Sequence, residues 1–168
     1  MSFNLKITDY EYISYIIDLL SDKEIKSLEN FEHHRITNRL YHSIDVSYKS
    51  YKIGKGFGLD STSLREISRA GLLHDLFFYD TKSKENKPKR HLSTHSEIAL
   101  MNAEKICILS EKEKNIILSH MFGVSFKHLP KYKESILVSM VDKIVSMNEV
   151  YNRFKRKTKV ISFEYIQQ

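Results

Sequence analysis

Cysteine is nearly absent from this sequence, which has Cys107 alone among its 168 residues. A single cysteine excludes a disulfide framework and a thiolate zinc site, and it is consistent with a reducing cytoplasm. The sequence also lacks an apolar run long enough to span a bilayer, and acidic Asp9 and Glu11 stand where a signal peptide would have its apolar core. We therefore predict a cytoplasmic protein with no membrane partner.

Residues that break helices are scarce as well, since the chain has two prolines and five glycines. Pro88, Pro130 and the cluster at 54–58 fall where connections between helices are expected. Between them, apolar residues recur every three or four positions, as expected for helices that bury one face. One such series is Tyr12, Ile13, Ile16, Ile17 and Leu20.

The length and the hydrophobic fraction of 41% suffice for one core, so residues 1–168 are expected to form a single domain. We predict an all-α, single-domain bundle of about seven or eight helices. Their expected ranges are 9–20, 22–31, 37–53, 61–79, 95–108, 111–121, 133–148 and 149–156. Helix starts are indicated by Ser or Thr followed three residues later by Glu, the capping-box pattern. It occurs at Thr8/Glu11, Ser21/Glu24, Ser63/Glu66, Thr94/Glu97 and Ser110/Glu113.

Basic residues exceed acidic ones, 27 to 21, which gives a formal charge of +6 and a pI near 9.2. This excess favours anionic partners such as phosphorylated small molecules or nucleic acid, without choosing between them. The basic residues gather in a segment at 80–92 and again at 153–159.

A histidine and an aspartate stand side by side inside the apolar segment 72–77, where charge must be paired or coordinated. Four further donors occur one per predicted helix, each among apolar residues. The full set is His42, His74, Asp75, His95, His120 and Asp142. One such residue alone is more often a hydrogen-bonded core residue than a ligand. Together, imidazole and carboxylate donors from several helices are typical of metal sites in bundles, and six donors suffice for two ions.

The order of these six residues resembles the HD-domain metal-dependent phosphohydrolase superfamily in its six-ligand, dinuclear form. The resemblance covers about 31–149, and the approach from Gly58-Leu59-Asp60 to Ala70-Gly71-Leu72-Leu73 is also similar. The helix at 9–20 and the basic segment at 150–168 would pack on this part or be appended to it.

The resemblance implies two divalent metal ions, with Fe or Mn expected first and Zn, Mg or Ni as alternatives. It implies that His42, His74, Asp75 and Asp142 hold the first ion. Asp75, His95 and His120 would hold the second, which makes Asp75 the bridge and, with His74, the catalytic pair.

Two departures from the family limit what the resemblance implies. Phe77 and Phe78 stand where several phosphodiesterase branches carry a catalytic lysine, and no Gly-Tyr-Pro motif is present, so cyclic dinucleotides are not implied. The candidates for a general acid are His34, His91 and Lys143. The candidates for phosphate contacts are Arg39, Lys87, Lys89 and Arg90, most of them in the basic segment.

The leading hypothesis is a metal-dependent phosphohydrolase, either a phosphomonoesterase or a phosphodiesterase. It would act on a small phosphorylated metabolite or nucleotide through a metal-activated hydroxide. One alternative is a mixed-valent di-iron oxygenase, a class that the six-ligand order also resembles. Another is a non-catalytic sensor or nucleic-acid-binding protein that uses the positive charge. The sequence leaves homo-oligomer formation open.

Overall fold

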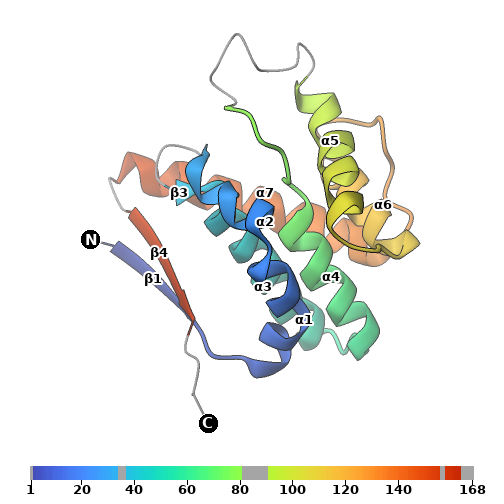
Figure 1. Ribbon diagram of the computed structural model, residues 1–168, viewed down its shortest axis with the longest axis horizontal. Helices are drawn as coiled ribbons and strands as arrows, with labels where there is room; N and C mark the ends of the chain where they lie inside the picture. The colour runs from blue at the N-terminus through green and yellow to red at the C-terminus, as the bar shows by residue number, and fades with distance from the viewer. Residues whose placement is uncertain (1, 34–36, 81–90, 156–157, 164–168) are drawn as a thin grey trace.

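Seven α-helices carry most of the residues that the computed structural model describes, which are 2–33, 37–80, 91–155 and 158–163 (Figure 1). They are α1 (Tyr10–Ser21), α2 (Lys23–Ser27), α3 (Arg39–Gly56), α4 (Ser61–Leu73), α5 (His91–Ile106), α6 (Glu111–Ser119) and α7 (Lys133–Phe154). A 3₁₀ turn, η1 (Leu28–Asn30), follows α2, where one helix over 22–31 was expected. The predicted all-α fold is confirmed.

Among the described residues, four short strands accompany the helices, and the helical pattern predicted none of them. β1 (Ser2–Ile7) pairs in parallel with β4 (Thr158–Phe163), so segments near the two ends of the chain lie side by side (Figure 1). β2 (Glu32–His33) and β3 (Thr37–Asn38) form a small antiparallel pair directly before α3. The partner of β1 lies near the other end of the chain and the partner of β2 lies a few residues further on, and helical periodicity reveals neither pairing.

The core lies between α3 and α4, which pack closely on each other and are covered by α1, α6 and α7. Its fully buried members include Ile16, Val46, Ile67, Leu72, Leu73, Ile116, Ile117, Val138 and Val145. Burying side chains of this size contributes about 1.5–3 kcal/mol each. Within the described part of the chain, no helix combines the length and the apolar character that a membrane span requires.

Aspartates cap most of the helices that the capping-box pattern assigned to Ser or Thr. Asp9, Asp22 and Asp60 accept hydrogen bonds from the first turns of α1, α2 and α4. Asp caps a helix as well as Ser and better than Thr, and three of the expected boxes are wrong by one to three residues. The fourth, at Thr94, lies inside α5, which begins at 91. The box of Ser110 and Glu113 at α6 is confirmed.

Two predicted helix ends are wrong in ways that matter for function. The helix expected over 61–79 ends at Leu73, and the chain turns, since the Leu76 and Phe77 amides donate to the Leu73 and Asp75 carbonyls. The two helices expected at 133–148 and 149–156 are the single helix α7. Asp142 and Glu149 therefore share one face of α7, two turns apart.

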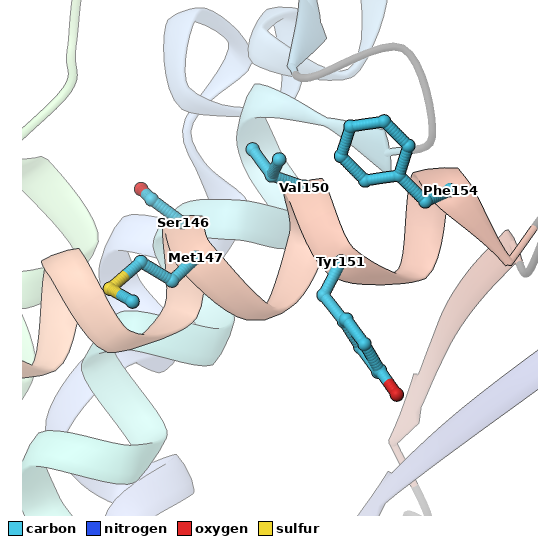
Figure 2. A pocket seen from close by; sticks show the side chains of 5 residues that line it. All are labelled: Ser146, Met147, Val150, Tyr151 and Phe154. Atoms are coloured by element: carbon cyan, nitrogen blue, oxygen red, sulfur yellow. The ribbon is translucent and has the colours of Figure 1, made fainter.

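The two faces of α7 differ in an unusual way. Asp142 and Glu149 are buried on the inner face, whereas Met147, Tyr151 and Phe154 are exposed on the outer face and line a shallow apolar pocket with Ser146 and Val150 (Figure 2). The inner face of this helix thus combines two carboxylates with the buried core residues Val138, Val141 and Val145.

Gly71 allows α4 to approach α3 closely, because a Cβ there would lie 2.9 Å from Ser47 Cα. We expect Gly71→Ala to lower the free energy of unfolding by about 1–3 kcal/mol through overpacking. Urea denaturation measures the effect. Gly56→Ala is the matched control, since a Cβ there meets nothing within 4 Å, and it should be neutral or slightly stabilising. Equal effects of the two substitutions would contradict the close approach.

Candidate metal centre

Five helices bring the six predicted donors into one buried cluster. α3 carries His42, His74 caps the end of α4 with Asp75 next to it, α5 carries His95, His120 caps the end of α6, and α7 carries Asp142. All six residues are buried, with Asp142 the most exposed at 8%. Their ligand atoms form two groups within which all atoms lie no more than 4.8 Å apart. One group is His42, His74 and Asp142; the other is Asp75, His95 and His120.

The first group is centred on Asp142. Its Oδ1 lies 3.2 Å from His42 Nε2 and 3.6 Å from His74 Nε2. Asp75 Oδ2 is 3.9 Å from the same nitrogen of His74. One carboxylate oxygen therefore faces two imidazole nitrogens, with Asp75 at the side.

The second group is tighter and is centred on the other oxygen of Asp75. Asp75 Oδ1 lies 3.5 Å from His95 Nε2 and 3.6 Å from His120 Nε2, and these two nitrogens are 2.8 Å apart. The two oxygens of one carboxylate thus face different groups, which is the arrangement that a bridging ligand requires.

The ends of α4 and α6 fix two of the imidazoles through backbone carbonyls. Nδ1 of His74 donates to the Gly71 carbonyl at 2.8 Å, and Nδ1 of His120 donates to the Ile117 carbonyl at 2.7 Å. These carbonyls are available because a helix leaves its last carbonyls without an internal partner. In a neutral ring, donation from Nδ1 leaves the lone pair on Nε2, the atom that faces the cluster.

Two of the atoms that face the cluster have no hydrogen bond among the described residues, namely His74 Nε2 and Asp75 Oδ1. Buried polar atoms of this kind are rare unless something satisfies them. Nitrogen and oxygen donors without thiolate suit Fe, Mn or Zn, so the residues fit a pair of divalent cations.

Electrostatics keep the carboxylates of the cluster ionised. Burial alone would raise the pKa of Asp75, but the nearby imidazoles, His74 first and then His95, hold that pKa far below its ordinary value. Asp142 behaves in the same way, since His42 and His74 outweigh its burial and lower its pKa. Two anionic groups in one buried pocket favour a cation.

The imidazoles divide into two kinds. Burial, with His95 and His74 nearby, lowers the pKa of His120 to about 3, so this ring is neutral at pH 7. Burial also disfavours the charged form of His42, but Glu149 and Asp142 outweigh it and raise the pKa of His42 to about 10. Without a cation, His42 therefore carries a proton.

The sequence analysis missed two residues at this centre, His33 and Glu149. Glu149 is 2% exposed, and its Oε2 accepts hydrogen bonds from Nδ1 of both His33 and His42. Nε2 of His33 lies 3.9 Å from Asp75 Oδ2. The expected helix break at 148/149 hid the spacing of Asp142 and Glu149, and the choice between adjacent His33 and His34 had no local signal.

The surroundings of Arg39 differ from those expected for a phosphate contact. Its side chain is fully buried, with Nη1 donating to the Phe77 carbonyl at 2.6 Å and Nη2 to the Tyr79 carbonyl at 3.2 Å, and its guanidinium lies over the Phe77 ring. Instead of the predicted phosphate contact, Arg39 has a structural role. Its two hydrogen bonds to these carbonyls hold the segment that follows Asp75.

Lys143, a candidate general acid, is half-buried beside the cluster. Its ammonium donates to the His120 carbonyl at 2.9 Å and to both oxygens of Ser139. Burial lowers the pKa of this lysine. The structure places the backbone of His91 at the start of α5 and does not describe its side chain. The remaining candidates, His34, Lys87, Lys89 and Arg90, lie outside the described residues.

Comparison with known families gives one match, the model described as HD domain, over residues 39–147. This span includes all six predicted donors and excludes His33 and Glu149. Neither the curated proteins nor the solved structures include a match to the chain.

We expect cation binding to release protons, because the pKa of His42 near 10 means that its ring must lose a proton before it can be a ligand. The apparent affinity for Mn²⁺ should therefore rise between pH 6 and pH 9, by about tenfold per pH unit for each proton displaced. Calorimetry in two buffers with different ionisation enthalpies measures the release. Binding that is independent of pH and of buffer would contradict the charge state of His42.

Proposed function

Because this chain belongs to the HD-domain family, we propose that it is a metal-dependent phosphohydrolase acting on a small phosphorylated metabolite or nucleotide. HD domains are commonly metal-dependent hydrolases, and the finer assignment to phosphate esters is our inference. The observation that carries it is the placement of Asp75, whose two oxygens face two separate donor groups. Paired sites of this kind are typical of enzymes that hydrolyse phosphate esters.

Six residues of this chain would hold two cations. His42, His74, Asp75 and Asp142 are the donors for the first, and Asp75, His95 and His120 are the donors for the second. When bound, two divalent cations lower the pKa of a water molecule toward neutrality and neutralise charge on a phosphoryl group.

Neighbouring side chains keep these donors in place. Ser139 Oγ donates to the His120 carbonyl at 2.7 Å, and Lys143, one turn further along the same face of α7, donates to the same carbonyl at 2.9 Å. We assign Lys143 to holding the end of α6, since three oxygens already receive its protons. Arg39 performs the corresponding task for the segment after Asp75.

The charge of the whole chain supports an anionic substrate. A net charge of +6 raises the local concentration of phosphorylated molecules around the protein. The predicted phosphate contacts of Lys87, Lys89 and Arg90 remain a prediction, as these residues are not described.

The direct test is hydrolysis of a panel of phosphate mono- and diesters by protein purified anaerobically and loaded with Mn²⁺ or Fe²⁺. We expect release of phosphate or of the alcohol without dioxygen, and loss of activity after treatment with a chelator. A strict requirement for dioxygen would favour the oxygenase alternative. Absence of bound metal, together with salt-sensitive RNA binding, would favour the non-catalytic alternative.

The number of ions bound per chain distinguishes a residue that binds both cations from a residue that binds only one. Asp75→Ala should remove both ions and reduce activity by at least 10³-fold, about 4 kcal/mol of transition-state stabilisation. His95→Ala should weaken the second site preferentially and leave about one ion per chain. Elemental analysis after gel filtration measures both. Two ions retained in Asp75→Ala would contradict the bridge.

A further inference from the structure

We propose that His33 is an additional donor to the first cation and that Glu149 is the positioning residue that aims both His33 and His42 at it. This inference rests on the proposed function insofar as that function requires a cation at the first group. Neither residue belongs to the six-residue pattern, and both lie outside the matched family span.

One oxygen of Glu149 orients two imidazoles from different elements. Its Oε2 lies 2.9 Å from Nδ1 of His33 and 3.2 Å from Nδ1 of His42. A carboxylate can only accept, so both Nδ1 atoms donate to it. Each ring then presents Nε2 on the opposite side, and in the neutral form that atom carries the lone pair a cation needs.

Both Nε2 atoms face carboxylate oxygens of the cluster. Nε2 of His42 lies 3.2 Å from Asp142 Oδ1, and Nε2 of His33 lies 3.9 Å from Asp75 Oδ2. The rings of His33 and His42 are stacked, with centroids 3.9 Å apart and an angle of 29° between them. His33, His42 and Asp75 also form a third group of ligand atoms within 4.8 Å of one another.

The local fold holds His33 at the edge of the centre. His33 pairs with Thr37 in the β2–β3 hairpin, and Asn38, the next residue of that hairpin, caps α3, the helix that carries His42. The side chain of His33 is 15% exposed, compared with 1% for that of His42. His33 is thus the donor on the solvent side of the first group.

Glu149 could instead be a buried carboxylate whose only task is to stabilise the fold, and metal affinity separates the two roles. A positioning carboxylate behind a ligand histidine changes metal affinity by about 10- to 100-fold when it is replaced. A carboxylate that serves only the fold leaves that affinity unchanged in any variant that still folds.

The experiment titrates metal-stripped full-length protein with Mn²⁺ by calorimetry and with Co²⁺ by visible absorption, which reports the ligand geometry. We expect Glu149→Gln to weaken the first site about 10- to 100-fold and to alter the Co²⁺ spectrum, with the second site retained. Glu134→Gln is the matched control, because Glu134 is also a buried glutamate of α7 and pairs with Lys112 away from the cluster. Glu134→Gln should change neither the Mn²⁺ affinity nor the Co²⁺ spectrum.

His33→Ala should weaken the same site by at least a similar factor. The control is His128→Ala, which removes a histidine that pairs with Glu97 at the surface. In the double variant Glu149→Gln/His33→Ala the loss should be smaller than the product of the single losses, because Glu149 acts partly through His33. Circular dichroism verifies that each variant folds. If Glu149→Gln does not fold, the metal affinity of His33→Ala decides the proposal, because that change is at a partly exposed position.

Unchanged affinity and spectrum in His33→Ala would overturn the assignment of His33, and the same result in Glu149→Gln would overturn that of Glu149. These outcomes are distinct from failure of the proposed function. If the wild type hydrolyses no phosphate ester but both variants bind Mn²⁺ more weakly, the inference stands without that function. If the wild type hydrolyses esters and the variants bind as it does, only the inference fails.

Discussion

The carboxylate of Asp75, buried among imidazoles, is the interaction on which the rest of the structure depends. A carboxylate removed from water is strongly destabilising unless charges or hydrogen-bond donors surround it. Here the imidazoles of His74 and His95 lower its pKa, the neutral ring of His120 lies beside it, and the three residues come from three different helices. The contacts around one buried carboxylate therefore bring together the ends of α4 and α6 and the N-terminal part of α5.

Helix ends, more than helix interiors, set the geometry of the centre. α4 and α6 both stop one residue before a histidine, and each histidine donates to the carbonyl three residues earlier. The same local arrangement thus occurs twice, and each time it turns Nε2 toward the cluster. Ser139, Lys143 and Arg39 then hold the chain around these ends through further carbonyl contacts.

α7 connects the centre to the hydrophobic core. Its buried face carries Asp142 and Glu149 beside Val138, Val141 and Val145, while further apolar side chains stand on its outer face. Buried carboxylates persist on a helix only where they are paired, and here the imidazoles of His33 and His42 pair with Glu149. The two carboxylates on the buried face of α7 are thus explained by the histidines around them.

The sequence was enough to predict the helical class and to single out the six His and Asp residues that the fold brings together, because helical periodicity is local and a charged residue in an apolar stretch is visible without a partner. The same locality explains the errors. The end of α4 at Leu73, the continuity of α7 and the pairing of β1 with β4 depend on contacts between distant segments. The hydrogen bonds of Arg39 to the Phe77 and Tyr79 carbonyls, and the placement of Glu149 and His33 beside the six residues, arise from contacts that form only on folding. A carboxylate and an imidazole 116 positions apart carry no sign of each other until folding brings them to 2.9 Å.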